Sequence, residues 1–267
     1  MIFSPSRRNF IRRGLAWSGL VLMVICFIWL QVLPAPEEPL LPGKPGLWRE
    51  PAVALVIIDA GHGGQDSGAM HNGVLEKDLT LDVARRIEGL ARAHGLRTMM
   101  TRPSDISVSL AARAAAANRE NDCVFVSIHF DEGNRPVATG VQTFYAAHQQ
   151  TGTALSSWLP FLQPALPQAV NFESQSLAAA VQAALVTRTH AFDRGTRAEQ
   201  FFVVANVRHP AVLVEAGFLS NNEDLARLAT EGYRQELATG ITEGVLRYRD
   251  ALNQRASLLT LGTAPPE

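Results

Sequence analysis

Two long, uninterrupted apolar segments constrain the fold of this chain more than any other feature. They are AVALVIID, which ends at Asp59, and CVFVSIHF, which begins at Cys123. A strand that is buried on both faces has a continuous apolar sequence, and such strands occur mainly in parallel sheets covered on both sides. We therefore expect a central sheet with helices packed against both of its faces.

Segments with helical periodicity alternate with these strands. EKDLTLDVARRIEGLARAHG places four apolar residues on one stripe of a helix, Leu79, Val83, Ile87 and Leu90. SLAARAAAANR, SQSLAAAVQAALVTR and the segment from Tyr233 to Val245 are predicted as further helices, and LRTMMTR, GVQTFYA, FFVVANV and AVLVEAGFL as further strands. This alternation predicts an α/β layer fold with a mostly parallel sheet.

The N-terminal part of the chain has the composition of an export signal. SRRNFIRR precedes about 20 uncharged residues, and its Arg7–Arg8 pair resembles a twin-arginine signal. A retained membrane anchor is the alternative, because the apolar run is long enough to span a bilayer. In both cases the positive residues stay inside, so the domain is expected in the periplasm.

Four segments follow from these features. Residues 1–33 are expected to form the signal or anchor, 34–51 a proline-rich linker, 52–252 one catalytic domain and 253–267 a flexible tail. The range 148–172 lacks clear periodicity and contains three prolines. It is expected to be either a loop that overhangs the site or a solvated insertion.

Charge and cysteine content exclude two classes of site. The chain has 24 basic and 25 acidic residues, a balance that does not favour nucleic acid as a partner. The two cysteines, Cys26 and Cys123, lie in apolar runs and cannot form a disulfide framework or a four-cysteine zinc site.

Polar residues at the ends of three predicted strands indicate the site. His62, His129 and Glu215 lie at or just after strand ends, where α/β sheets bind ligands, and Glu76 opens the first long helix after the Asn72-Gly73 turn. A single histidine at a strand end is more often a structural hydrogen-bonding residue, and a glutamate in a first helical turn is favoured by the helix dipole alone. It is the combination that points to a metal.

Glu215 is a carboxylate in an otherwise apolar run, LVEAG, where an uncompensated charge is costly. A metal ion or a raised pKa would compensate it. A buried salt bridge to Arg85 or Arg113 is the alternative. Asp59 could orient a ligand, although a structural role at the strand end is favoured. The histidines at 71, 94, 148, 190 and 209 are expected at the surface.

Two imidazoles and one carboxylate make a ligand set that zinc accepts with a fourth position left for water. In this interpretation His62, Glu76 and His129 hold the ion. Glu215 accepts the proton of the attacking water and returns it to the leaving nitrogen. This chemistry is the hydrolysis of an amide or ester.

Three segments resemble the zinc-dependent N-acetylmuramoyl-L-alanine amidases of bacterial cell-wall turnover. They are GHGGQDSGAMHNGVLEKD, SLAARAAAANRENDCVFVSIHFD and PAVLVEAGFLSNNED, and the resemblance covers roughly Val53 to Leu252. It implies a twisted six-stranded sheet flanked by helices, zinc on His62, Glu76 and His129, and Glu215 as the catalytic carboxylate. It also implies peptidoglycan as the substrate, cut between muramic acid and L-alanine.

The chain departs from this family in two places. Phe130 and Asp131 follow the second histidine, where the family commonly has a small residue and asparagine. The range 148–172 is shorter than the insertion of the regulated division amidases, so control by a displaced helix is not supported. An activator protein and a membrane anchor stay open as further partners.

Two other functions compete with hydrolysis. A catalytically silent envelope protein would keep the fold to bind peptidoglycan or a division partner, but all four site residues are present. Nucleotide binding by GHGGQDSG lacks the lysine followed by serine or threonine of a phosphate-binding loop.

Overall fold

The computed structural model describes residue 23 and residues 53–132, 137–149 and 171–261. The chain divides into two units, and the second, Glu50–Glu267, contains the sheet and the helices that pack on it. Nearly all of the predicted signal or anchor, the linker, and residues 150–170 of the proline-rich segment lie outside the described residues. Within the described ranges, no helix is long and apolar enough to cross a membrane.

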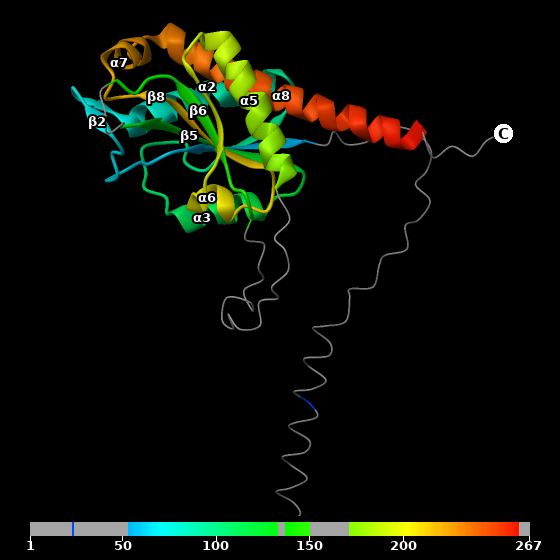
Figure 1. Cartoon of the computed structure of the whole chain (residues 1–267). Helices are drawn as coiled ribbons and strands as arrows, with labels where there is room; N and C mark the ends of the chain where they lie inside the picture. The colour runs from blue at the N-terminus through cyan, green and yellow to red at the C-terminus, as the bar shows by residue number, and fades with distance from the viewer. Residues whose placement is uncertain (1–22, 24–52, 133–136, 150–170, 262–267) are drawn as a thin grey trace, which may run out of the picture. The chain divides into compact units, whose positions relative to one another are not determined.

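A six-stranded sheet forms the centre of the domain, in the order β4-β1-β5-β8-β6-β7 (Figure 1). All neighbouring strands are parallel except β6 and β8, which are antiparallel. The predicted α/β fold with a mostly parallel six-stranded sheet is therefore confirmed. The strands are β1 Leu55–Ala60, β4 Arg97–Met100, β5 Cys123–Asp131, β6 Val141–Tyr145, β7 Asp193–Ala198 and β8 Ala211–Phe218.

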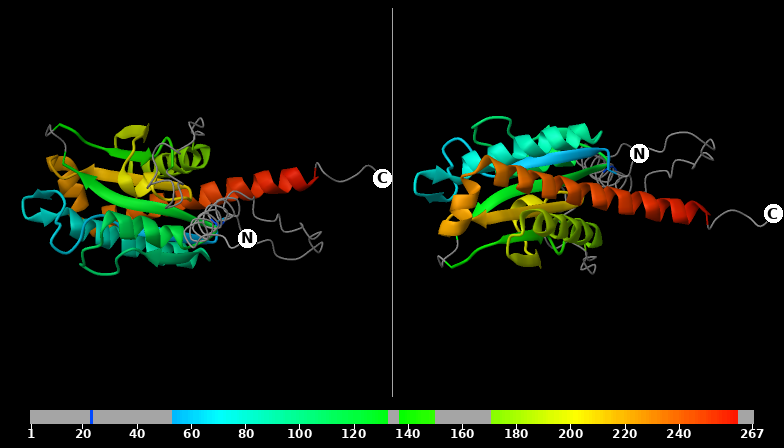
Figure 2. Two further views of the ribbon diagram at one scale, coloured as in Figure 1. Left: turned by 90° about the horizontal axis from the view of Figure 1, so that it is seen from below. Right: turned by 90° about the horizontal axis from the view of Figure 1, so that it is seen from above.

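Helices cover the two faces of the sheet unequally (Figures 1 and 2). The long helices α2 (Glu76–Ala93), α5 (Phe172–Thr189) and α8 (Glu231–Leu261) pack on one face. The other face carries the shorter α3 (Leu110–Asn118) and α6 (Phe202–Ala205). The remaining helix, α7 (Asn222–Leu228), follows β8.

The alternation of side chains in β5 explains its unbroken apolar sequence. Val124, Val126 and Ile128 enter the core beneath α2, α5 and α8, whereas Cys123 and Phe125 enter the smaller core beneath α3 and α6. All five side chains are buried. Burial on both faces is the condition under which a strand has no polar alternation.

One predicted strand is wrong, and one strand was not predicted. FFVVANV does not form a strand, because Phe202–Ala205 is the short helix α6. Short apolar runs fit a buried strand or a buried helical turn equally well, and Val203 and Val204 are buried. The sixth strand is instead β7, Asp193–Ala198, at the edge of the sheet. Its polar, mostly exposed sequence, DRGTRA, carries no strand signal.

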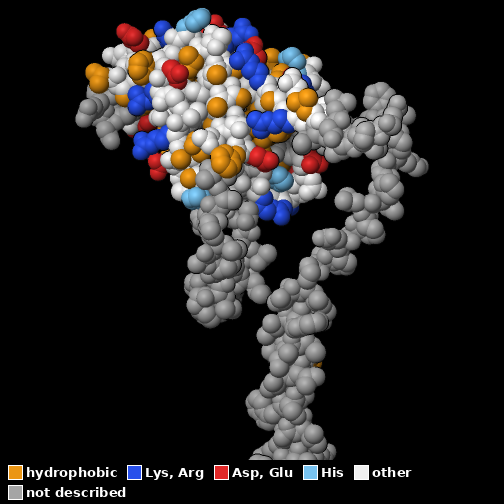
Figure 3. Space-filling model, turned by 45° about the vertical axis from the view of Figure 1, so that its right-hand side comes forward, with side chains coloured by type: hydrophobic (Ala, Val, Ile, Leu, Met, Phe, Trp, Pro, Cys, Tyr) orange, Lys and Arg blue, Asp and Glu red, His pale blue; other side chains and the backbone are white. Residues whose placement is uncertain are grey.

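The last helix continues to Leu261, into the range expected to form a flexible tail. Tyr248 is buried against the core, whereas Leu258 is exposed. In Figure 2 the end of this helix projects beyond the sheet. The face of the molecule seen in Figure 3 carries interspersed acidic and basic side chains, in agreement with a net charge of −1.

A two-residue hairpin leads into α2 and sets where that helix begins. β2 (Met70–His71) pairs with β3 (Val74–Leu75), and the turn residues Asn72 and Gly73 have φ values of 49° and 79°. Positive φ at both positions is the pattern of the type I′ hairpin turn, for which Asn-Gly is favoured. The turn signal is therefore confirmed, and Glu76 is the first residue of α2.

Candidate metal centre

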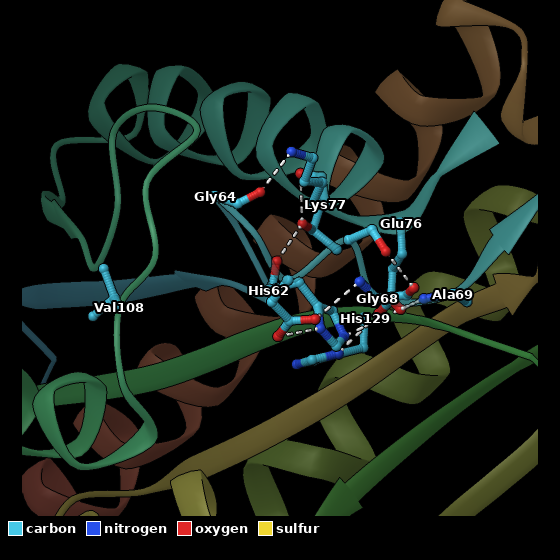
Figure 4. A network of polar contacts seen from close by, with 12 residues as sticks. His62, Gly64, Gly68, Ala69, Glu76, Lys77, Val108 and His129 are labelled. Carbon is cyan, nitrogen blue, oxygen red and sulfur yellow. Dashed lines mark hydrogen bonds and ion pairs between the residues drawn. The ribbon is translucent and has the colours of Figure 1, made fainter. Parts of the chain in front are cut away.

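Three side chains from three separate elements converge at the carboxyl edge of the sheet (Figure 4). His62 follows β1, Glu76 opens α2, and His129 lies near the end of β5. His62 Nε2 is 3.1 Å from Glu76 Oε2, and His129 Nδ1 is 2.9 Å from Glu76 Oε1. One ligand atom from each residue lies within 4.8 Å of the other two.

The spacing of these atoms suits a single divalent ion. Ligand atoms about 2.1 Å from a tetrahedral ion are about 3.4 Å apart, close to the observed separations. The two imidazole rings meet edge to face, with centroids 4.9 Å apart, so both can direct a nitrogen to one point. Two imidazoles and a carboxylate are ligands that zinc and other divalent metals accept. The donor set therefore fits a metal ion.

Glu76 is held in the ionised form that a metal ligand requires. Burial raises its pKa, but hydrogen bonds with His129 and His62 outweigh this effect and lower the pKa to about 2. The backbone amides of Ala69 and Phe130 also donate to its carboxylate, at 2.8 and 3.0 Å. The four contacts fix both carboxylate oxygens.

Asp66 orients the imidazole of His62. Its Oδ2 lies 2.9 Å from His62 Nδ1, and its Oδ1 accepts a hydrogen bond from the Gly68 amide. The pKa of His62 is raised, first by its hydrogen bond with Glu76, and the contact with Asp66 adds to this. A carboxylate on the second ring nitrogen leaves Nε2 free to bind a metal. Asp66 had no predicted role, although its four-residue spacing from His62 was a usable signal.

Two glycines make room for the ligands. A Cβ on Gly61 would lie 2.4 Å from His129 Cε1, and a Cβ on Gly68 would lie 2.4 Å from Glu76 Oε2. Gly68 also has a φ of +63°, a conformation that other residues rarely adopt. The glycine-rich segment thus packs around the ligands.

Glu215 stands beside these ligands on the next strand. It is the register partner of His129 in the parallel pair β5–β8, so both side chains project from the same face. Its Oε2 is buried and has no hydrogen-bond partner among the described residues. Burial, and then the nearby Glu76 and Asp131, raise the pKa of Glu215 well above its usual value. Glu215 is therefore a carboxyl group in apolar surroundings without a compensating partner among the described residues, as its sequence LVEAG indicated.

The alternative salt bridge to Glu215 does not form. Arg113 Nη1 pairs with Asp59 Oδ1 at 2.7 Å, and Arg85 donates to the carbonyl of Pro103. Asp59 also accepts hydrogen bonds from Thr101 and Ser127. Asp59 therefore has the structural position that was favoured for it, and both arginines are engaged away from Glu215.

A cavity of about 250 Å³ opens next to the metal ligands. It is lined by His62 and His129 on one side and by Val108, Ser109 and Leu110 at the start of α3 on another. Val108 lies on the loop seen beside His62 in Figure 4, and Val203 of α6 completes an apolar part of the wall. The cavity gives a substrate access to the ligands from the less covered face of the sheet.

The remaining histidines take no part in the cluster. His94 and His190 are exposed, as predicted, and His71, His148 and His209 are partly exposed. Burial lowers the pKa of His209.

Phe130 stands directly after His129, where the family commonly has a small residue. Its side chain is buried in the core beneath the long helices, and only its backbone amide contacts the site.

Comparison with known proteins identifies relatives of the chain. The sequence model of a family described as N-acetylmuramoyl-L-alanine amidase matches residues 56–247. LytC, an N-acetylmuramoyl-L-alanine amidase of Bacillus subtilis, is 31% identical over 75% of this chain and 36% of its own length. AmiA of Escherichia coli, another such amidase, is 29% identical over 77% of this chain and 79% of its own length.

A solved structure agrees with these relatives. The crystal structure of an N-acetylmuramoyl-L-alanine amidase from Clostridium difficile superimposes with a TM-score of 0.63 and 32% identity. The match covers 74% of this chain and 98% of that one. The solved amidase thus shares the fold of this chain over that matched part.

Proposed function

The chain belongs to the N-acetylmuramoyl-L-alanine amidase family and is therefore a peptidoglycan hydrolase, and we propose that it uses zinc held by His62, Glu76 and His129. The bond cut joins N-acetylmuramic acid to L-alanine. One observation carries the proposal for the site. Three ligand atoms converge on one point beside a buried carboxyl oxygen that has no partner among the described residues.

Each ligand is prepared for its role by the contacts around it. Asp66 holds the His62 ring with Nε2 toward Glu76, and the amides of Ala69 and Phe130 fix the Glu76 carboxylate. When bound here, zinc supplies a Lewis acid that polarises the amide carbonyl and makes a water molecule more acidic.

We propose that Glu215 moves the proton. Its raised pKa makes the ionised carboxylate a stronger proton acceptor, and a cation on the neighbouring ligands would favour that ionised form. It lies next to His129 across the β5–β8 pair, so it faces the same space as the metal ligands. The carboxylate takes a proton from the attacking water and delivers it to the leaving nitrogen of L-alanine.

As a cell-wall amidase, the chain acts outside the cytoplasm. We propose that residues 1–33 act as a twin-arginine-like signal that directs it to the periplasm or stay as an inner-membrane anchor. Residues 34–51 then serve as the linker to a catalytic domain at 52–252. The Arg7–Arg8 pair and the apolar run that follows it support this arrangement.

Digestion of purified murein by the purified full-length chain tests the function. We expect mass spectrometry to find free peptides that begin with L-alanine, and metal analysis to find about one zinc per chain. Soluble fragments that keep the peptide on muramic acid would indicate a glycosidase instead, and murein left undigested would support a catalytically silent envelope protein. Turnover by the chain alone would show that no activator protein is required.

Substitution of Glu215 tests its role in the same assay. Glu215→Gln is expected to keep the metal and to lose about 10² to 10⁴-fold in turnover, the usual contribution of proton transfer. Glu223→Gln, an exposed glutamate in the first turn of α7, is the matched control and should retain full activity. Wild-type turnover in Glu215→Gln would assign proton transfer to another group.

A further inference from the structure

Two buried arginines hold three consecutive backbone carbonyls at the end of β1. These carbonyls belong to Ala60, Gly61 and His62, the residues that carry the chain from the strand into the first metal ligand. The arginines come from two later segments, Arg102 after β4 and Arg113 in α3. Neither arginine contacts the proposed ligand atoms themselves.

Arg102 is fully buried, with a relative exposure of 0%, and makes no ion pair within the described part of the chain. Its Nε donates to the Ala60 carbonyl at 2.9 Å, and its Nη2 donates to the Gly61 carbonyl at 2.9 Å. The same Nη2 donates to the Lys77 carbonyl at 2.7 Å and lies 2.9 Å from Thr80 Oγ1. Arg102 thus joins the loop before His62 to the first turn of α2, which begins with Glu76.

Arg113 secures the other side of the same loop. Its Nη1 donates to the Ala60 carbonyl at 2.6 Å and to Asp59, and its Nη2 donates to the His62 carbonyl at 2.7 Å. Asp59 is in turn fixed by the hydroxyls of Thr101 and Ser127. The guanidinium of Arg113 therefore cannot turn away without breaking a buried network.

These bonds matter because His62 has an uncommon backbone conformation. Its φ is 59°, in the left-handed region that a residue with a Cβ seldom adopts. Without the bonds to its carbonyl and to the two before it, the chain can relax to negative φ, which redirects the imidazole. Strained backbone of this kind persists at functional sites when the surroundings determine it.

We propose that Arg102 and Arg113 are positioning residues that preorganise His62 and Glu76 for metal binding. The inference rests on the proposed metal function of these two ligands. A planar guanidinium with five donors can hold several carbonyls in fixed directions, which the single ammonium group of lysine cannot do. Arginine is therefore required at both positions for geometry, and its charge alone does not suffice.

The test compares Arg102→Lys and Arg113→Lys with the wild type in the full-length chain. Zinc affinity is measured by competition with a chelator, and the cobalt-substituted proteins are compared by their visible absorption, which reports ligand geometry. We expect a 10- to 100-fold loss of zinc affinity, the usual effect of removing a group that orients a ligand, and an altered cobalt spectrum.

Arg234→Lys is the matched control. Arg234 is also largely buried and bonds a carboxylate, Asp82, and a carbonyl, Leu228, but it lies on α8. The Arg234→Lys substitution should lower the melting temperature of the metal-free protein and leave zinc affinity unchanged. If the arginine variants do not fold, Thr80→Val takes their place in the test. This substitution removes the hydroxyl that donates to the Gly61 carbonyl, and we expect a several-fold loss of zinc affinity.

The outcomes separate this inference from the proposed function. The positioning role alone is overturned if the wild type binds zinc and both lysine variants bind it with the same affinity. If the lysine variants do not fold, unchanged zinc affinity in Thr80→Val has the same meaning. Losses no larger than that of Arg234→Lys overturn it in the same way. A wild-type chain that binds no zinc overturns the metal site and the positioning role together.

Discussion

At the scale of single residues, Gly68 shows how closely the ligands are packed. Its Cα lies so near to Glu76 and His62 that a methyl group there would overlap both side chains. Gly73, in the hairpin turn, has a similar positive φ of 79° but has no atom within 4 Å of a Cβ placed on it. The two glycines therefore separate the effect of backbone conformation from the effect of contact with the site.

We predict that Gly68→Ala lowers zinc affinity and Gly73→Ala does not. Gly73→Ala should cost about 1–2 kcal/mol of stability, because alanine disfavours the left-handed region. Gly68→Ala should cost more, because its methyl group also overlaps Glu76 and His62. Only Gly68→Ala displaces Glu76 and His62, so we expect it alone to weaken zinc binding by about 10-fold or more. Thermal unfolding of the metal-free proteins and chelator competition measure the two effects. Equal zinc affinity in both variants would contradict the prediction.

His62, Glu76 and His129 were predictable because each lies near a strand end or at a helix start that has its own sequence signal, whereas Glu215 lies inside β8 and not at its end, where it had been expected. Glu215 was also marked by its charge in an apolar run. Asp66 and Arg102 were not assigned, because their roles depend on atoms brought close by the fold. Arg102 bonds backbone carbonyls from a different part of the chain, and a carbonyl leaves no mark in the sequence.

At the scale of elements, α2 joins the site to the long C-terminal helix. Its first residue, Glu76, faces the metal site, and on a different side Asp82 bonds both Arg86 of the same helix and Arg234 of α8. Burial raises the pKa of Asp82, but the bonds from Arg86 and Arg234 outweigh it and lower the pKa below its usual value. Asp82 therefore connects α2 and α8 only while it is ionised.

We predict that Asp82→Asn destabilises the protein at pH 7 and has little effect in acid. A carboxyl group with a depressed folded pKa contributes stability above its unfolded pKa, and that stability is lost as the pH falls through the folded pKa. Because Asp82 is partly exposed, we expect about 1 kcal/mol or less, roughly 2 to 4 °C in melting temperature at pH 7. The difference from wild type should shrink progressively below about pH 4.

Melting temperatures at pH 7, 5 and 3 test this prediction. Asp250→Asn is the control, since Asp250 pairs with its neighbour Arg249 at the surface and joins no two elements. It should change the melting temperature little at any pH. A constant difference between Asp82→Asn and wild type from pH 7 to pH 3 would rule out the ion pairs as its cause.

One element was predicted with the wrong type and another was missed: FFVVANV forms the helix α6, and the polar segment DRGTRA forms the strand β7. Periodicity reports burial, and both a central strand and a buried helical turn satisfy it over four or five residues. An edge strand has one unpaired side, so β7 can be polar. Elements buried on two faces were therefore predictable, whereas the polar edge strand β7 and the short helix α6 were not.

At the scale of the whole molecule, the metal site adds to a domain that already has two hydrophobic cores. One lies under α2, α5 and α8 and the other under α3 and α6, and neither needs a metal to be buried. The site occupies only the carboxyl edge of the sheet. Folding and metal binding should consequently be separable.

We predict that the chain stays folded after its metal is removed with a chelator. Far-ultraviolet circular dichroism should be unchanged, while the melting temperature falls. At a free zinc concentration 100 times the Kd, binding stabilises by about 2.7 kcal/mol, or roughly 5 to 10 °C for a domain of this size. Loss of helical signal at 25 °C on chelation would show instead that the metal is needed for folding.

The unequal coverage of the sheet has a consequence for the kind of molecule that this enzyme can process. Peptidoglycan is a cross-linked net, and a bond within a net cannot be drawn into an enclosed chamber. On the face with α3 and α6, the cavity opens beside His62 and His129, which are both partly exposed, so the proposed ligands can be reached at the edge of the sheet. We therefore expect an intact mesh to be cut in place at this edge, without first being broken into soluble pieces.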